Sequence, residues 1–278
     1  MAVIGADWTV LKLGGELLED EARMHGLART VADASRRGPL TVVHGGGREI
    51  DAALARAGIQ KRQVDGLRIT DAATLAVVVE VLAGAVNTRF VAAVNAAGGA
   101  AVGLTGADGR LAPVRRAEPH VGVDGSVTDL GLVGQPYGGG RPVLLEHLAA
   151  GGYVPVVASL GIGEDGAVYN VNADTLGADL AGRLGARRLI IAGATPGVLD
   201  AAGRTIPALD PETRRRLIAS GVASAGMIAK LRACEDALAH GAHEVVLVDG
   251  RDPRAIAALV GGAETSGTFD GMSTRMVA

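Results

Sequence analysis

The sequence has few aromatic residues and almost no cysteine, and both shortages limit what it can form. Aromatic residues make up 2% of the 278 residues, whereas hydrophobic residues make up 48%. A core of this chain therefore has to be built from Ala, Val, Leu and Ile. The single cysteine, Cys234, excludes an internal disulfide and a thiolate metal cluster. It lies in a helical pattern, where we expect a buried or half-buried small residue.

Several classes of protein are disfavoured by charge and hydropathy patterns that are missing. The formal net charge is −3, and no Lys/Arg cluster is interleaved with aromatic residues, so nucleic acid is not an expected partner. The N-terminus lacks the basic region and apolar stretch of a signal peptide. No run of about 18 apolar residues is free of charge and glycine, so no membrane span is expected. We therefore expect a soluble, cytoplasmic protein.

The common nucleotide-binding signatures are absent or misplaced. GxxxxGK[ST] does not occur, which excludes a P-loop enzyme. Residues 161–166 match GxGxxG, but a strand-like segment follows them where a dinucleotide fold needs a helix. We expect a hairpin over 161–169, which disfavours a nicotinamide oxidoreductase. His240 and His243 are interpreted as structural, and we predict no metal ligands in the chain.

A regular alternation of short apolar runs and helical patterns fills the chain. It predicts a three-layer α/β/α sandwich around a mainly parallel sheet, with two lobes that share the sheet and meet near residue 175. Residues 105–139 carry turn signals and short β segments, which we expect to form hairpins at a rim. The predicted strands of the sheet are Thr9–Leu13, Leu40–His44, Ala100–Leu104, Val154–Ala158, Arg188–Ala192 and Glu244–Val248.

Two glycine clusters directly follow predicted strands. Gly14 and Gly15 come after the first strand, and Gly46 and Gly47 come after the second and open a helix. Glycine lets the backbone approach a ligand closely, and amides at a helix N-terminus bind anions. Because ligands of open α/β sheets bind beyond the carboxyl ends of the strands, both clusters are expected to face one crevice. Lys12, at the end of an apolar strand, would then be a cation directed at phosphate.

Six motifs occur in the order and spacing of a known family. They are KLGGELLED, VVHGGG, DGLRIT, YNVNAD, ATPGVLD and GMIAK. With these motifs the chain, from about residue 8 onward, resembles the amino acid kinase family, and most of all its acetylglutamate kinases. The resemblance implies the amino acid kinase fold, with residues 1–175 binding the acyl-amino-acid and residues 176–278 binding ATP. It also implies transfer of the γ-phosphate of ATP, with Mg²⁺, to the γ-carboxylate of N-acetyl-L-glutamate in arginine and ornithine biosynthesis.

The resemblance further implies a role for individual residues. Lys12 and Lys230 would neutralise charge on the transferred phosphoryl group, and Asp174 would hold both lysines in position. Arg68 would pair with the α-carboxylate of the substrate, and Asn170 would bind near its acetamido end. Backbone amides would come from Gly14 and Gly15 for phosphate and from Gly46 and Gly47 for the acyl-amino-acid. The nucleotide pocket would be lined by Ala194, Thr195, Pro196, Gly197, Val198, Leu199, Val222, Ala223 and Ser224.

The residue types suit these roles on physical grounds. Arginine provides planar, bidentate recognition of a carboxylate, as expected of Arg68. Asp174 falls at a predicted helix start, where the dipole favours an ionised carboxylate, and Thr70 and Asp71 form a probable cap for another helix. Lys230 is expected in the first turn of a helix, an end that disfavours a cation unless bound phosphates compensate it. Mg²⁺ is expected to arrive with ATP.

One departure from the family pattern and several rival functions remain at this stage. Relatives usually carry an acidic or amide residue at the position of Ala194, so a polar contact to the nucleotide is expected to be missing. The rivals are a kinase for carrier-linked aminoadipate or glutamate and a non-catalytic, amino-acid-sensing family member. Retention of Lys12, Asp174 and Lys230 argues against the sensor. Aspartate kinase is disfavoured because no regulatory domain follows the kinase region.

The assembly is expected to be a homodimer that arginine does not inhibit. Relatives that arginine inhibits carry an extra N-terminal helix, and eleven residues precede Lys12 here. The dimer contact would use an apolar helix over Ala72–Ala97, and the alternative is that this helix only packs on the sheet. Its apolar stripe consists of Leu75, Val78, Val79, Leu82 and Val86.

Overall fold

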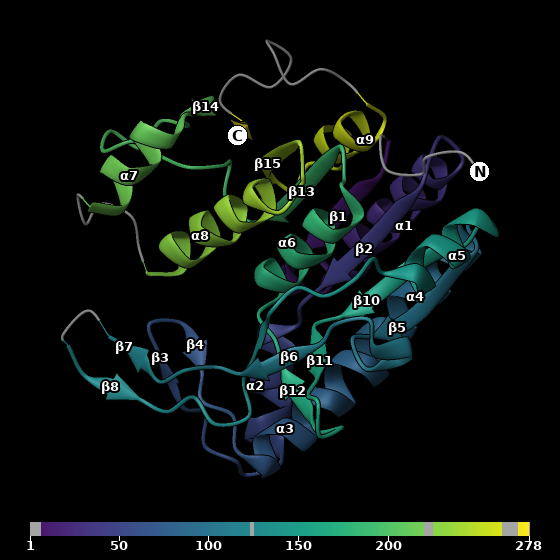
Figure 1. The fold of residues 1–278 in the computed structure, drawn as a ribbon. Helices are drawn as coiled ribbons and strands as arrows, with labels where there is room; N and C mark the ends of the chain where they lie inside the picture. Colours follow the sequence, from purple (N-terminus) through teal and green to yellow (C-terminus); the bar gives the residue numbers. More distant parts are fainter. Residues whose placement is uncertain (1–6, 123–124, 220–224, 263–271, 278) are drawn as a thin grey trace.

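An eight-stranded, mostly parallel sheet forms the centre of the molecule (Figure 1). The computed structural model describes residues 7–122, 125–219, 225–262 and 272–277. The strand order is β14-β16-β15-β13-β1-β2-β10-β5, and only the β15–β16 pair is antiparallel. The strands are β1 (Thr9–Leu13), β2 (Leu40–His44), β5 (Ala101–Thr105), β10 (Val154–Ala158), β13 (Arg188–Gly193), β14 (Ala208–Leu209), β15 (Glu244–Asp249) and β16 (Ser273–Val277).

The strand order reverses direction at β1. From β1 the chain proceeds to β2 on one side, whereas β13, which follows much later in the sequence, pairs with β1 on the other. Strands before residue 175 therefore occupy one half of the sheet, and strands after it occupy the other. All six predicted strands are confirmed, with ends that differ by at most one residue. Their uninterrupted apolar sequences fit strands that are covered on both faces.

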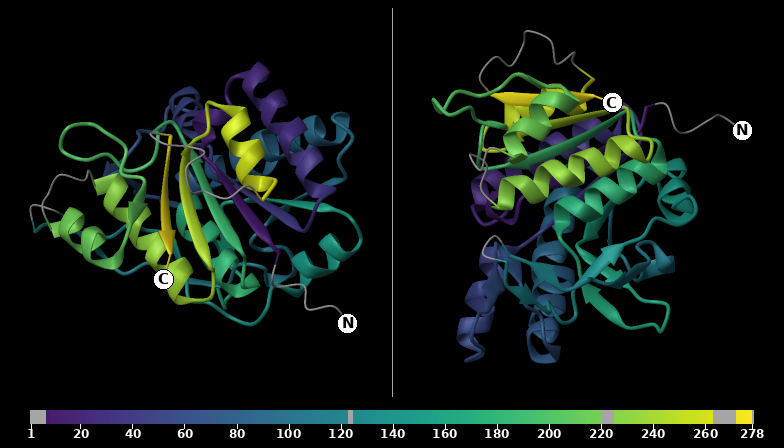
Figure 2. Two further views of the ribbon diagram at one scale, coloured as in Figure 1. Left: turned by 90° about the horizontal axis from the view of Figure 1, so that it is seen from above. Right: turned by 60° about the vertical axis from the view of Figure 1, so that its left-hand side comes forward.

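Helices cover both faces of the sheet (Figure 2), which confirms the predicted three-layer sandwich. One face carries α1 (Glu21–Ser35), α9 (Pro253–Val260) and the long helical segment from residue 72 to 96. The other carries α5 (Val143–Ala150), α6 (Ala173–Leu184) and α8 (Ala225–Ala239). Further helices are α2 (Gly47–Arg56), α7 (Pro211–Ala219) and the short 3₁₀ turns η1 (Gly15–Leu17) and η3 (Asp108–Arg110).

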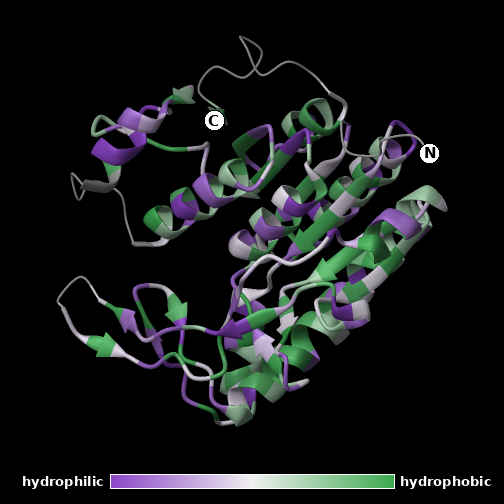
Figure 3. Ribbon diagram, in the orientation of Figure 1, coloured by the Kyte–Doolittle hydropathy of each residue, from purple (hydrophilic) through white to green (hydrophobic). Residues whose placement is uncertain are grey.

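The core lies on the two faces of this sheet, where Figure 3 shows hydrophobic residues concentrated in the strands. Side chains alternate between the faces, as the pleat of a strand requires. In β1, Val10 belongs to the cluster beneath α6 and α8, whereas Leu11 and Leu13 belong to the cluster beneath α1. Leu, Val, Ile and Ala supply most of this core, in line with the scarcity of aromatic residues.

The long helix runs through α3 (Ala72–Val79), a π-helical segment labelled η2 (Glu80–Val86) and α4 (Asn87–Ala96). By length and composition it is apolar enough to cross a membrane, but here it packs on the sheet and on α1. Val78, Leu82 and Val86 are at most 1% exposed. The prediction that these three residues form a dimer contact is therefore wrong, because they are already buried in the core of their own chain.

Four small hairpins stand apart from the sheet. β6 (Val114–Arg116) pairs with β9 (Gly134–Pro136), and β7 (His120–Val121) pairs with β8 (Val127–Thr128), as predicted for residues 105–139. β11 (Leu160–Ile162) pairs with β12 (Val168–Asn170), which confirms the hairpin over the GxGxxG match. The fourth joins β3 (Gln63–Val64) to β4 (Leu67–Arg68) and was not predicted.

Candidate active site

The two glycine clusters meet at the carboxyl ends of β1 and β2. These strands are parallel neighbours, and Leu13 lies opposite His44 in their register. A Cβ atom on Gly15 would lie 2.6 Å from Cα of Gly46 and 2.8 Å from its amide nitrogen. Because real Cβ atoms do not approach a backbone this closely, glycine is needed at position 15 for the two loops to touch.

The amides of these loops differ in how much they can offer a ligand. Gly14 N–H donates to the carbonyl of Ala192 at 2.9 Å, so this amide is already used inside the sheet. Within the described residues, the amides of Gly46 and Gly47 have no backbone or side-chain acceptor. Gly47 begins α2, where the first amides of a helix have no partner in the helix itself. Gly15 N–H likewise has no acceptor among the described residues, so both clusters present free amides.

Asp174 lies between Lys12 and Lys230. Its Oδ1 atom is 2.8 Å from Lys12 Nζ, and its Oδ2 atom accepts a hydrogen bond from Lys230 Nζ at 2.9 Å. The first contact is an ion pair without the alignment of a hydrogen bond, because buried Oδ1 has no hydrogen-bond donor among the described residues. Three distant segments supply the cluster: β1, the first turn of α6 and α8.

Local structure explains how each member is placed. The side chain of Asn172 caps α6 by accepting the amide protons of Asp174 and Thr175, which fixes the first turn over β1. Gly177 of α6 faces Lys12, and a Cβ there would lie 3.4 Å from Cβ of Lys12, an ordinary packing distance. Lys230 lies in the second turn of α8 and not in the first, because the helix begins at Ala225, ahead of the GMIAK motif.

Burial and charge act against each other in this cluster. Burial alone would raise the pKa of Asp174, but the charges of Lys12 and Lys230 outweigh it and hold that pKa well below its usual range. Burial lowers the pKa of Lys12, with Lys230 adding to the shift and Asp174 opposing it. With both lysines protonated, Lys12, Lys230 and Asp174 together carry a net charge of about +1 in a site that is largely shielded from water.

Arg68 is held by groups that come from α2. Its Nη2 atom donates to Gly47 O at 3.3 Å and pairs with Asp51, a residue that the sequence analysis did not single out. Asp51 also accepts a hydrogen bond from Lys61 Nζ at 2.7 Å. These two cations lower the pKa of Asp51 although its partial burial opposes them.

One nitrogen of Arg68 remains available. Nη1 is buried and has no hydrogen-bond partner among the described residues, and the side chain is 14% exposed. Burying a guanidinium nitrogen without an acceptor costs free energy. We therefore infer that Nη1 binds an anionic or carbonyl group of a ligand. Asp51 is one helical turn after Gly47, and that spacing was the available signal for it.

Asn170 joins the hairpin β11–β12 to the segment that follows Arg68. Its Nδ2 atom donates to Thr70 Oγ1 at 3.2 Å, and Thr70 is fully buried. Asp71 caps α3 by accepting the amide proton of Thr74 at 2.8 Å, which confirms the predicted cap. Arg68 and Asn170, which lie 102 positions apart in the sequence, are thereby linked through Thr70.

A cavity of about 370 Å³ opens between the hairpins and α8, and none of the predicted site residues that the structure describes lines it. Its lining includes Leu67, next to Arg68, and Ala229, next to Lys230. His120 Nε2 is 2.8 Å from Asp65 Oδ2, so the β7–β8 hairpin is tied to the turn of β3–β4 at the rim of this cavity. The sequence-predicted hairpins therefore border this cavity.

The predicted nucleotide residues follow β13, the strand next to β1. Ala194 and Thr195 are exposed, whereas Val198 is buried and donates its amide proton to Thr274 Oγ1 at 2.8 Å. Gly197 has a positive φ of 98°. The structure thus places residues 194–199 at the same edge of the sheet as the lysines. The remaining predicted contacts, Val222, Ala223 and Ser224, lie outside the described residues.

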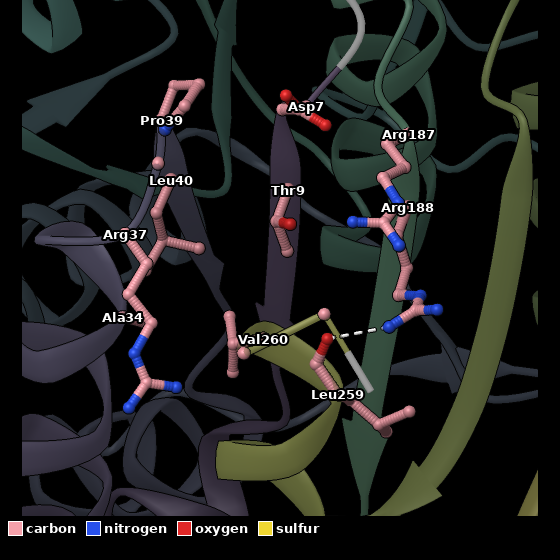
Figure 4. Close-up of a pocket in the computed structure, with 13 residues that line it drawn as sticks. Asp7, Thr9, Ala34, Arg37, Pro39, Leu40, Arg187, Arg188, Leu259 and Val260 are labelled. Atoms are coloured by element: carbon pink, nitrogen blue, oxygen red, sulfur yellow. Dashed lines mark hydrogen bonds between the residues drawn. The ribbon is translucent and has the colours of Figure 1, made fainter. Parts of the chain in front are cut away.

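The cysteine lies close to this site, whereas a second pocket lies apart from it. In the described part of the chain, no three His, Cys, Asp or Glu residues are grouped as metal ligands. Cys234 is fully buried, and burial raises its pKa to about 12. A pocket of about 240 Å³ lies at the opposite edge of the sheet, near Thr9, Leu40 and Arg188 at the amino ends of their strands (Figure 4). It contains none of the predicted site residues.

Known proteins resemble this chain both in sequence and in fold. The chain is 42% identical over 253 residues to an acetylglutamate kinase of Methylobacterium nodulans, covering 89% of this chain and 83% of that protein. It is 43% identical to an acetylglutamate kinase of Gluconacetobacter diazotrophicus, covering 90% and 80%. An N-acetylglutamate synthase structure from Neisseria gonorrhoeae has the same fold, with a TM-score of 0.81 and 22% identity over 99% of this chain and 60% of that one. The profile of the amino acid kinase family matches residues 7–249. The chain therefore belongs to the amino acid kinase family.

Proposed function

We propose that the protein transfers the γ-phosphate of ATP to the side-chain carboxylate of N-acetyl-L-glutamate, giving N-acetylglutamyl phosphate for arginine biosynthesis. The observation that carries this proposal is that Asp174 of α6 pairs with both Lys12, near the carboxyl end of β1, and Lys230 of α8, beside the two glycine clusters. Relatives named acetylglutamate kinase, similar over about nine-tenths of the chain, support the same reaction.

The chemistry needs charge stabilisation more than proton transfer. The acceptor carboxylate is already ionised at pH 7, so a general base would have no proton to remove. Its oxygen forms a bond to the γ-phosphorus, while the bond from that phosphorus to the bridging oxygen breaks and ADP leaves with the electron pair. Catalysis of such a transfer comes from positioning and from stabilising the negative charge.

The site residues suit the donor side of this transfer. Lys12 and Lys230 would approach the transferred phosphoryl group from two directions, and Asp174 keeps both ammonium groups within 3 Å of one carboxylate. The free amides of Gly46 and Gly47 would supply further hydrogen bonds to anionic oxygens. Mg²⁺ bound to ATP would neutralise part of the charge on the phosphates.

The acceptor side rests on Arg68 and Asn170. The unpaired Nη1 atom of Arg68 is suited to the α-carboxylate of the substrate, since Asp51 already occupies Nη2. Asn170, held through Thr70, would contact the acetamido end of the same molecule.

An assay of acceptor choice tests the proposal directly. ADP release is measured with N-acetylglutamate, glutamate, N-acetylaspartate and N-acetylaminoadipate, and hydroxylamine traps any acyl phosphate as a hydroxamate. We expect N-acetylglutamate to give the highest kcat/KM and a stoichiometric hydroxamate. No ADP release with any of the four acceptors would leave a carrier-linked acceptor or a sensor as the function.

Two variants test the role of the lysines, and a third serves as their control. Lys12→Ala and Lys230→Ala each remove one cation, and each is expected to lower kcat by at least about 10²-fold, on the scale of losing one preorganised donor. Arg254→Ala, on α9, removes an arginine whose side chain is 90% exposed and is expected to leave kcat unchanged. A lysine variant with near-normal kcat would remove that lysine from the mechanism.

The proposed setting is a cytoplasmic homodimer. A dimer interface would have to use surfaces other than Val78, Leu82 and Val86, which are buried within the chain. Light scattering coupled to size-exclusion chromatography measures the mass directly. A monomer or a higher oligomer would contradict this part of the proposal and leave the reaction unaffected.

A further inference from the structure

The buried imidazole of His44 has no role in the mechanism above. His44 is the last residue of β2, directly before the second glycine cluster, and its side chain is fully buried. Its Nε2 atom is 3.0 Å from Asn87 Nδ2, and its Nδ1 atom is 3.1 Å from Gly45 O. A buried polar side chain with two such specific contacts is costly to keep unless both are satisfied.

The hydrogen bonds of Asn87 determine which nitrogen of His44 carries the proton. Asn87 Nδ2 donates to the carbonyl of Val156 at 2.9 Å, which identifies this atom as the NH₂ group. Its second hydrogen faces His44 Nε2, which must therefore accept, and the proton of a neutral imidazole is left on Nδ1. Burial lowers the pKa of His44 to about 4, so the ring is neutral at pH 7.

The protonated Nδ1 atom fixes the peptide that joins Gly45 to Gly46. Nδ1–H donates to Gly45 O and thereby holds this carbonyl toward the interior. In a planar trans peptide the C=O and N–H groups point in opposite directions. The N–H group of Gly46 must therefore point away from His44. Gly15 packs against the same peptide, since a Cβ on Gly15 would lie 2.8 Å from this nitrogen.

The π-helical segment supports both ends of this arrangement. Asn87 follows directly after η2, and a Cβ on Gly46 would lie 2.9 Å from Cδ2 of Leu82 and 3.3 Å from Cγ2 of Val86. The same helix therefore packs beneath the glycine loop and holds the histidine that orients it. A Cβ on Gly103 would lie 2.1 Å from Asn87 Oδ1, so only glycine leaves room for this amide. Wide helical turns of this kind often occur at functional sites.

We propose that His44, kept in its Nδ1–H tautomer by Asn87, is a positioning residue that aims the Gly46 amide at the anionic oxygens of the reacting groups. This inference rests on the proposed kinase function. Consecutive glycines have little intrinsic preference for one peptide orientation. If this peptide turned over, Gly45 O would replace Gly46 N–H and would repel the phosphoryl group and the acceptor carboxylate instead of stabilising them.

Two substitutions of His44 separate this role from a merely structural one. In His44→Asn the side-chain NH₂ can take the place of Nδ1–H, at the same number of bonds from the backbone, and can still donate to Gly45 O. In His44→Gln the amide lies one bond further out, near the place of Nε2, and only the contact with Asn87 can be kept. Each variant loses one buried hydrogen bond, so their melting temperatures should be similar.

The expected result is a difference in turnover between the two variants. His44→Asn should keep kcat within about threefold of the unsubstituted protein. His44→Gln should lower kcat by at least about tenfold, which is less than the loss caused by deleting an oxyanion donor altogether. KM for ATP and for the acceptor should change little in both. Affinity for ADP with aluminium fluoride, which mimics the transferred phosphoryl group, should fall in parallel with kcat.

Other outcomes would overturn the inference. Equal kcat in both variants, or a loss of kcat that follows the melting temperature alone, would show that His44 is only a structural residue.

If the unsubstituted protein transfers phosphate to none of the acceptors, the proposed function fails, and the position of the amide is tested by NMR. The ¹⁵N–¹H signal of Gly46 should then shift on addition of a non-hydrolysable ATP analogue in His44→Asn but not in His44→Gln. Equal responses would contradict the inference here too.

Discussion

Asp174 connects two lysines that come from opposite halves of the chain, and this one carboxylate sets the electrostatics of the site. Lys12 lies in the sheet and Lys230 on a helix above it. Burial lowers the pKa of Lys12 and so disfavours its charged form, whereas the carboxylate of Asp174 raises that pKa. The charge state of Lys12 at working pH therefore depends on a neighbour that is far away in the sequence.

This dependence predicts a change in the pH profile of an Asp174→Asn variant. Lys12 must be protonated to stabilise phosphate, and its pKa lies below the usual 10.5, so kcat should fall as the pH rises through that lowered value. Removing the carboxylate charge lowers the pKa of Lys12 further. The alkaline limb of kcat should therefore move to lower pH in the variant. An unchanged alkaline limb, measured alongside ATP affinity by calorimetry, would mean that Lys12 does not titrate in this step.

Arg68 predicts a change in the acceptor KM rather than in the ATP KM. Arg68→Lys keeps a positive charge but loses the planar pair of donors, of which one holds Asp51 and the other is free. KM for N-acetylglutamate should rise at least about tenfold, the size of losing one charge-assisted hydrogen bond, with KM for ATP nearly constant. Equal increases in both constants would exclude Arg68 as the carboxylate anchor.

Among the small elements, the β3–β4 hairpin carries Arg68. Asp65 and Gly66 form its turn with φ values of 47° and 81°. Two consecutive positive φ angles are typical of a type I′ turn, for which Asp-Gly is a preferred pair. The turn therefore determines where β4 begins and from which direction Arg68 approaches Asp51.

A backbone substitution at this turn tests that dependence. Gly66→Ala meets no atom within 4 Å, so its effect comes from the positive φ alone, at a cost of about 1 kcal/mol. We expect KM for the acyl-amino-acid to rise severalfold with KM for ATP unchanged. Gly152→Ala is the matched control, with a φ of 80° and no atom within 4 Å, in the turn before β10. Similar kinetics in the two variants would show that the hairpin does not position Arg68.

At the scale of the whole molecule, the carboxyl ends and the amino ends of the strands have different roles. The carboxyl ends of the strands hold the lysines and glycine loops, whereas a buried ion pair lies at the other end. Arg188, the first residue of β13, pairs with Glu244, the first residue of β15, and Glu244 also pairs with Arg275 of β16. Three neighbouring strands are thereby joined at the edge that faces away from the site.

This separation predicts a variant that loses stability and keeps its catalysis. Glu244→Ala removes a carboxylate that is 10% exposed and leaves the buried Arg188 without that counter-charge. The free energy of unfolding should fall by roughly 3–5 kcal/mol in urea, as for other broken buried pairs. Asp33→Ala, which breaks an exposed pair with Arg36, should cost less than about 1 kcal/mol. A loss of kcat in folded Glu244→Ala would contradict the division between the edges.

Local sequence was sufficient for features that depend on neighbouring residues. The central strands Thr9–Leu13, Leu40–His44 and Val154–Ala158 were predicted with their observed ends, because a parallel strand covered on both faces is a continuous apolar run. The GxGxxG match was identified as a hairpin for a similar reason. In contrast, β16 (Ser273–Val277) was missed, since its residues alternate between buried and exposed and it lies near an edge of the sheet.

The contacts that define the site were decided by the tertiary structure. The sequence by itself determined which residue types stand at the ends of β1 and β2, and the family resemblance indicated that Lys12, Asp174 and Lys230 belong together. It did not identify Asp51 as the partner of Arg68, or Asn87 as the partner of His44, because these pairs are 17 and 43 positions apart. Such pairings depend on how α2 and the long helix pack against the sheet, and packing is a property of the whole chain.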